Sequence, residues 1–306
     1  MSLSPQKADN LPMQALLPRQ WIILILLTLI WGINWPIMKL GVTGYAPLTF
    51  RALSITLGVP VLGLALWRMK VPFRVERKDW NALFWLAFAN MFVWHALIIV
   101  AVSKLSSGRA AILGYTMPIF SAILGATIFG DRLRPRAWGG VATAALGVAL
   151  LLWHELTQLA GNPTAVMMAL TAAAVWALGT QNLRRTPLTI PTLTISFWMT
   201  AMTAVVMIAL SFLLERDRWA MPSSTSWGAI LFNAIMIFGF AHAAWFYLAR
   251  TLPPVASTLS VMFIPILGVF SGAWWLGEVL HWQDWTAVVL MVVAIASVLW
   301  PSRKSA

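Results

Sequence analysis

The chain has no cysteine, and only nine of its 306 residues are acidic. Without cysteine, disulfides, thiol chemistry and cysteine-ligated metal sites are excluded. Charged residues of both signs make up 10% of the chain, whereas hydrophobic residues make up 60%. A soluble globular protein carries about a quarter charged residues. This chain therefore has too few charges to cover a soluble surface.

Long apolar runs fill the chain in place of charge. Ten of them are each long enough to cross about 30 Å of hydrocarbon as a helix. They comprise residues 21–39, 46–67, 80–101, 109–129, 136–153, 164–183, 189–213, 226–249, 255–275 and 283–300. The sequence thus predicts an all-α integral membrane protein with ten transmembrane helices, embedded in a lipid bilayer.

The net charge of +12 would suggest a nucleic-acid partner in a soluble protein. Here the basic residues lie in short loops between apolar segments, so topology explains them and no nucleic acid is expected. With the N-terminus in the cytoplasm, 15 of the 21 Lys and Arg residues fall on the cytoplasmic side. The other six are Lys39, Arg51, Lys104, Arg109, Arg216 and Arg218. This imbalance places both termini in the cytoplasm.

One stretch of the chain occurs twice, at 117–138 and again at 264–285. At a shift of 147 residues the aligned pairs are Pro118 with Pro265, Gly130 with Gly277, Asp131 with Glu278, Trp138 with Trp285 and, outside the stretch, His95 with His242. We therefore divide the chain into a tail (1–20), two five-helix repeats (21–155 and 162–301) and a second tail (302–306). Because five is odd, the second repeat is inverted in the membrane, an arrangement typical of carriers with a central cavity. The alternative is a duplication that only packs a stable bundle.

These features resemble the EamA-type drug/metabolite transporters. The resemblance rests on two copies of P-x(11)-G-[DE]-x(6)-W, on IWGINWPIMK from Ile30 and on AAVWALGTQNL in the second half, and it covers essentially the whole chain. It implies a transporter of a small molecule, with no cofactor and no enzymatic activity. Within the family the chain is most similar to the bacterial YddG-type exporters of aromatic amino acids. That similarity implies a monomer in the bacterial cytoplasmic (inner) membrane that exports aromatic and other hydrophobic amino acids.

Acidic residues are expected in tails, in loops or in the last turn of a helix, never in the middle of the membrane. Carriers driven by protons commonly use an intramembrane carboxylate, so its absence favours an uncoupled uniporter working by alternating access. It also argues against a cationic substrate. The alternative is a carrier of another neutral metabolite or drug that exchanges protons through His95 and His242, the only ionisable residues placed well inside helices. No cluster of His or acidic residues has metal-ligand spacing.

The first helix gives the clearest candidates for substrate binding. Trp31, Asn34, Trp35 and Met38 share one helix face. Lys39, near the outer end, can either extend to the membrane surface or meet an anionic group. Asn34 offers its amide to a polar substrate group, or else forms an interhelical hydrogen bond. The remaining candidates are Trp94, His95, Tyr115, Met117, Trp176, Thr180, Phe238, His242 and Trp245. For any single aromatic or Met residue among them packing is the more common role, and the two histidines are equally open to it. Trp176 is expected to face Trp31 across the cavity.

Pro118 and Pro265 are predicted hinges, with static kinks as the alternative. The Gly130–Asp131 and Gly277–Glu278 pairs are predicted to end their helices, with the acids paired to nearby arginines. Two other functions fit less well. A nucleotide-sugar carrier needs a deep cationic cluster for phosphate, and an enzyme needs a buried catalytic set; the sequence offers neither.

Overall fold

The computed structural model describes residues 18–131, 135–157, 162–251 and 263–299. Its regular elements are helices. They are α1 (Pro18–Val42), α2 (Pro47–Arg68), η2 (Arg77–Asp79), α3 (Trp80–Ala87), η3 (Phe88–Phe92), α4 (Val93–Lys104), α5 (Ser107–Gly114), α6 (Met117–Thr127), α7 (Pro135–Thr157), α8 (Pro163–Arg185), α9 (Thr192–Glu215), η4 (Arg216–Arg218), α10 (Ser224–Phe232), η5 (Asn233–Ala241), α11 (His242–Thr251), α13 (Phe263–Leu276) and α14 (Trp282–Leu299).

Seven continuous helical runs are long and apolar enough to cross a membrane, α13 and α14 are shorter apolar helices, and α7 is a further helix of 23 residues. The prediction of an all-α protein with ten membrane helices is confirmed. The boundaries shift slightly, because α1 begins at Pro18, inside the predicted tail. Residues 255–262 of the ninth predicted segment lie outside the described residues.

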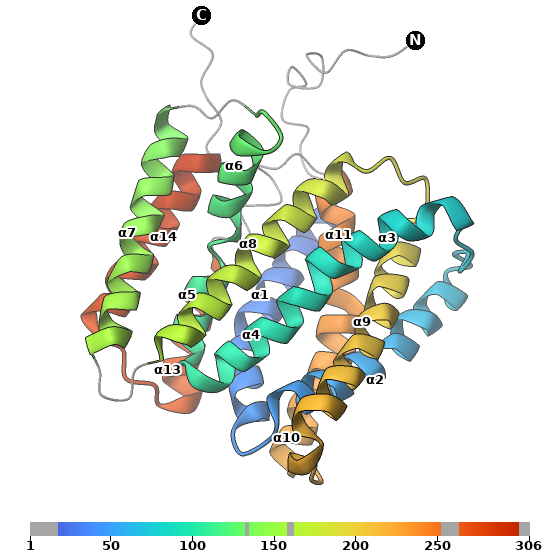
Figure 1. Ribbon diagram of the computed structural model, residues 1–306, viewed down its shortest axis with the longest axis horizontal. Coiled ribbons are helices and arrows are strands. Elements are labelled where there is room, and N and C mark those ends of the chain that lie inside the picture. The colour runs from blue at the N-terminus through green and yellow to red at the C-terminus, as the bar shows by residue number, and fades with distance from the viewer. Residues whose placement is uncertain (1–17, 132–134, 158–161, 252–262, 300–306) are drawn as a thin grey trace, which may run out of the picture.

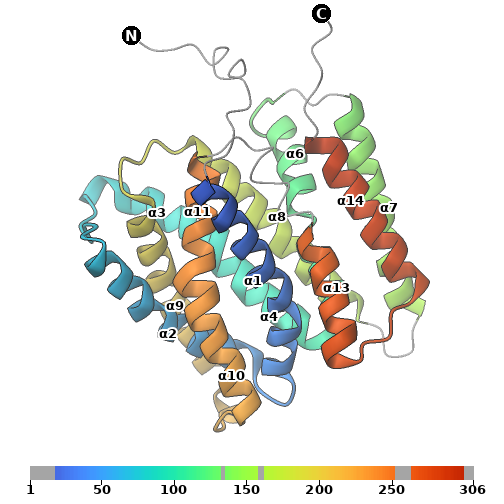
Figure 2. The same cartoon turned by 180° about the vertical axis from the view of Figure 1, so that it is seen from behind.

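The two repeats enter the membrane from opposite sides. In Figure 1, α1 runs from the upper face to the lower face, whereas α8, the first helix of the second repeat, runs from the lower face to the upper. The last helix, α14, ends at the upper face, where α1 begins (Figure 2). The distribution of basic residues predicts that the upper face is the cytoplasmic one.

The repeats interlock instead of lying side by side. Helix α1 packs against α13 of the second repeat, and α4 packs against α8. Around this centre, α7 pairs with α14 on one side and α2 pairs with α9 on the other (Figure 1). The centre of the molecule is therefore built from helices of both repeats, which is where an inverted-repeat carrier holds its substrate.

Equivalent helices of the two repeats are both interrupted by π-helix. The run Arg77–Lys104 contains η3, and the run Ser224–Arg250 contains η5. His95 lies just after the first π-helix, and His242 directly follows the second. A π-helix shifts the hydrogen-bonding register by one residue and occurs frequently at functional sites.

The fourth predicted segment is also interrupted. Helix α5 ends at Gly114 and α6 begins at Met117, so Pro118 lies in the first turn of a new helix. Proline is tolerated there because its missing N–H has no intrahelical partner to lose. Pro265 is the third described residue of α13, and residues 252–262 before that helix lie outside the described residues. Pro118 thus follows a break between two helices, and its role as a hinge stays a prediction.

The two repeated glycines end their helices as predicted. Gly130 and Gly277 follow α6 and α13 with φ angles of +70° and +63°, a conformation that favours glycine at a helix C-terminus. Asp131, the next residue, pairs with Arg185 at 2.7 Å, as expected. Glu278 has a different partner: it accepts hydrogen bonds from the start of α5, from the backbone N–H of Ser107 and Gly108.

Candidate functional site: a cavity between the repeats

A small cavity of about 40 Å³ lies between the two repeats. The residues that line it are Trp31, Asn34, Trp35, Met38, Arg51, Trp94, His95, Ile98, Tyr115, Met117, Trp176, Ile237 and His242. They come from α1, α2, α4, α8 and η5–α11 and from the region of the α5–α6 break. A space of this size holds no more than a few water molecules, so an amino acid requires the cavity to widen.

The two histidines meet at the centre of the molecule. The rings of His95 and His242 lie 5.1 Å apart, and each residue is 2% exposed. His242 Nδ1 lies 2.9 Å from the carbonyl oxygen of Ile237, a spacing that the π-helix provides. Neither ring nitrogen of His95 has a hydrogen-bond partner within the described residues. The repeat-related pair thus has one member anchored to the backbone and one with free hydrogen-bonding capacity.

Tryptophans from both repeats surround this pair. Trp31 of α1 and Trp176 of α8 both contact the ring of His242, at 6.1 and 5.8 Å. Trp94 lies 5.1 Å from Trp176. Trp31 and Trp176 line the same cavity, as the sequence predicts, although the contact that links them runs through His242.

Trp35 reaches the cavity because of a glycine. A Cβ atom at Gly114 would lie 2.7 Å from Trp35 Cη2 and 3.3 Å from Trp94 Cη2. The distance to Trp35 is shorter than real Cβ atoms show, so any larger residue at the end of α5 would displace the Trp35 ring. Tyr115 follows directly and packs edge-on against Trp35 at 6.0 Å. The break between α5 and α6 therefore also shapes the aromatic wall.

Arg51 is the cavity residue that the sequence analysis misplaced. It was counted among the charges of the outer loops, yet its side chain is 1% exposed and lines the cavity. Arg51 Nη1 donates to Asn233 Oδ1 at 3.1 Å, and Asn233 Nδ2 donates to Asn34 Oδ1 at 3.0 Å. The Asn34 oxygen is thus occupied by an interhelical hydrogen bond. Arg51 is the sixth residue of the predicted apolar segment 46–67. A charged residue inside such a segment was the signal that could have revealed this network.

Four predicted site residues lie outside the cavity lining. Lys39 Nζ donates to the carbonyl oxygens of Val102, Ser103 and Leu105, so it caps the end of α4. The other three pack behind the lining residues. Thr180 Oγ1 donates to Asn90 Oδ1 at 3.4 Å, Phe238 stacks on His242 at 5.2 Å, and Trp245 lies 5.6 Å from Trp31.

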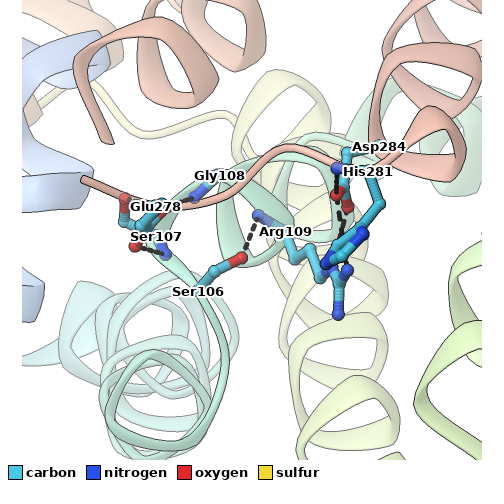
Figure 3. A network of polar contacts seen from close by, with 7 residues as sticks. All are labelled: Ser106, Ser107, Gly108, Arg109, Glu278, His281 and Asp284. Carbon is cyan, nitrogen blue, oxygen red and sulfur yellow. Dashed lines mark hydrogen bonds and ion pairs between the residues drawn. The ribbon is translucent and has the colours of Figure 1, made fainter. Parts of the chain in front are cut away.

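A polar network joins the two repeats at the lower face (Figure 3). The Glu278 carboxylate accepts from Ser107 N at 2.6 Å, from Ser107 Oγ at 2.9 Å and from Gly108 N at 3.2 Å. Beside it, Arg109 pairs with Asp284 at 2.7 Å. Asp284 lies in the first turn of α14, not in a last turn as expected of the acids. These contacts hold the start of α5 against the α13–α14 connection.

The cavity carries positive charge and no negative charge. None of the residues that line it is acidic. Across residues 18–131, 135–157, 162–251 and 263–299, no three His, Asp or Glu side chains gather in a way that could hold a metal ion. Among the lining residues, Arg51 Nε and both ring nitrogens of His95 are buried polar atoms with no hydrogen-bond partner in the described part of the chain.

Comparison with known proteins gives one family. The model of the EamA-like transporter family matches residues 19–153 and again residues 163–300. A solved structure described as the crystal structure of a protein has a TM-score of 0.69 to this chain at 20% identity, covering 92% of this chain and 97% of its own. At that identity it shows a shared fold.

The chain is also similar, at low sequence identity, to proteins whose names describe transporters or an efflux pump. The uncharacterized transporter YoaV of Bacillus subtilis is 24% identical over 89% of this chain and 92% of its own. The uncharacterized inner membrane transporter YedA of Escherichia coli K12 is 27% identical, over 90% and 89%. A probable amino-acid metabolite efflux pump of Escherichia coli K12 is also 27% identical, over 52% of this chain and 51% of its own.

Proposed function

The chain belongs to the EamA-like transporter family, and from that premise we propose that it carries aromatic and other hydrophobic amino acids across the membrane by alternating access. Family membership makes the chain a multi-pass membrane transporter and not an enzyme. The substrate, the direction and the energetics are proposals. We also propose that it works as a monomer in the bacterial inner membrane, where the relative YedA is placed by name.

The observation that carries the substrate class is the aromatic wall of the cavity. Trp31, Trp35, Trp94 and Trp176 line one small space at the meeting point of the repeats. Indole and phenyl rings stack on such walls, each pair contributing about 0.5–1.5 kcal/mol beyond burial. A ligand pocket that is mostly apolar with few convergent polar groups suits a molecule with an apolar body and a small polar head.

Export is the proposed direction. The relative named as a probable amino-acid metabolite efflux pump matches about half of this chain. That match supports an amino-acid substrate without defining which one.

Uncoupled transport is the proposed mechanism. A carboxylate relay is the usual device of proton-driven carriers, and no acidic residue lines this cavity. The inverted repeats supply two similar conformations, each open to one face, that exchange as the halves move around the cavity. The substrate would then move down its own gradient.

Transport by purified protein tests the proposal. Proteoliposomes would be given labelled tryptophan, phenylalanine or threonine, with and without an imposed pH gradient, beside protein-free liposomes. We expect saturable uptake of the aromatic substrates that the pH gradient leaves unchanged. If none of the three enters faster than in protein-free liposomes, the substrate assignment is wrong while the fold stands.

A second mechanism is favoured by one contact. The His95 and His242 rings touch across the repeats, and such a pair could pass a proton during exchange for another neutral metabolite or drug. In the same experiment, uptake that follows the pH gradient and is lost in His95→Gln would replace the uniport mechanism with this one.

A further inference from the structure

Arg51 is a buried cation that the protein does not neutralise. It lies near the start of α2, is 1% exposed and lines the cavity. No ion pair joins it to a carboxylate within the residues that the structure describes. An isolated charge inside a membrane protein is costly and is usually found in an ion or substrate pathway.

The partners of Arg51 are all neutral. Nη1 donates to the amide oxygen of Asn233 at 3.1 Å, and Nη2 donates to Met38 Sδ at 2.8 Å, a weak acceptor. The guanidinium lies 5.6 Å from the Phe238 ring centre. Nε is buried with no hydrogen-bond partner. The asparagine holds the guanidinium in place, and the remaining donors have capacity for a better acceptor.

The buried carboxylate of Glu215 binds α2 at a different residue from Arg51. Glu215 accepts from Thr49 N at 2.8 Å and from Thr49 Oγ1 at 2.9 Å. Thr49 precedes Arg51 by two residues, which places the two side chains about 200° apart around α2. The carboxylate of Glu215 therefore binds the opposite side of the helix and leaves the charge facing the cavity unpaired.

We propose that Arg51 binds the carboxylate of the transported molecule, and that the cavity takes aromatic monocarboxylates whether or not they carry an amino group. Guanidinium binds carboxylate through two parallel hydrogen bonds, and Nε with Nη2 forms such a fork once Met38 Sδ is displaced. An ammonium group finds no carboxylate in the lining and lies near a positive charge, so it adds little to binding. This inference rests on the proposed function and names the group that its substrates share.

A set of four matched ligands separates the charges. They are L-phenylalanine, 3-phenylpropionate, 3-phenylpropanamide and phenethylamine, titrated calorimetrically against purified protein in detergent. We expect the two carboxylates to bind with similar affinity, and the amide and the amine to bind at least about tenfold more weakly, the loss typical of a charged hydrogen bond.

Variants then assign the preference to Arg51. Arg51→Gln should weaken both carboxylates at least about tenfold and leave the amide unchanged, whereas Arg51→Lys keeps the charge and should retain part of the preference. Arg250→Gln is the matched control, because Arg250 also binds the protein through Leu188 and Ile190 carbonyls but lies outside the cavity lining. Thermal unfolding would establish that each variant is folded.

The outcomes distinguish the two claims. If folded Arg51→Gln bound phenylalanine as tightly as the wild type does, the role of Arg51 would be overturned and the proposed function would stand. Binding of phenylalanine without 3-phenylpropionate would overturn the claim that the amino group is dispensable. Absence of binding by either carboxylate to folded wild-type protein would overturn the substrate class and this inference together.

Discussion

The lower-face contact of Glu278 should govern how often the cavity opens to that face. Its carboxylate, on the second repeat, accepts from Ser107 N, Ser107 Oγ and Gly108 N at the start of α5 in the first repeat. A carboxylate at a helix N-terminus is stabilised by these donors and by the helix dipole. Opening to the lower face requires the repeats to separate there, so these hydrogen bonds favour the closed state.

Glu278→Gln removes the charge and replaces one acceptor oxygen with an amide N–H₂ that faces donors. A hydrogen bond to a charged group contributes about 1.5–3 kcal/mol, and the lower value applies because Glu278 is only partly buried. A loss of about 1.4 kcal/mol changes an equilibrium tenfold. The lower-face-open population should therefore rise about tenfold.

The absence of native cysteine makes this measurable. A single cysteine at Ile98, which lines the cavity and is 1% exposed, would report opening through its rate of labelling by a membrane-impermeant maleimide added to intact cells. The labelling rate should rise about tenfold in Glu278→Gln. Glu76→Gln is the control, because its ion pair with Lys78 is exposed and contributes little. An unchanged labelling rate in folded Glu278→Gln would refute the reasoning.

Three further changes test other parts of the structure. Gly114→Ala places a carbon 2.7 Å from Trp35 Cη2, and we expect a loss of about 1–3 kcal/mol in thermal unfolding; unchanged stability would contradict the close packing. His95→Gln should take up substrate at the same rate with and without an imposed pH gradient, as the wild type should, because the proposed uniport moves no proton. Asp131→Asn breaks a half-exposed pair with Arg185, and the free energy of unfolding should fall by less than about 1 kcal/mol.

The spans and the repeat were predictable because the membrane imposes them. A helix must present about twenty apolar residues to cross the bilayer, so hydropathy alone locates each crossing. The face shared by Trp31, Asn34, Trp35 and Met38 follows from helical spacing, and all four line the cavity. Repeat equivalence predicted that His95 and His242 belong together, and their rings are in contact.

The interruptions were not predictable from the same signals. Hydropathy does not depend on the backbone hydrogen-bonding register, so the π-helices η3 and η5 and the α5–α6 break leave no trace in it. Arg51 was misplaced because it lies near the start of the predicted segment 46–67, and a basic residue near a segment boundary is interpreted as a loop charge. The carbonyl groups that Lys39 binds, at the end of α4, could not be predicted either, because they lie far along the chain from it.

The most direct test of the central claim is tryptophan counterflow by the wild-type protein, by one double variant in the cavity and by one single variant outside it. Trp31→Leu with Trp176→Leu removes ring stacking from the cavity, whereas Trp138→Leu changes an exposed ring outside it. We predict counterflow in the wild type, an apparent affinity about two- to tenfold lower per removed ring contact in the cavity variant, and no change in Trp138→Leu. Equal affinity in all three proteins would contradict the assignment of this cavity as the substrate site.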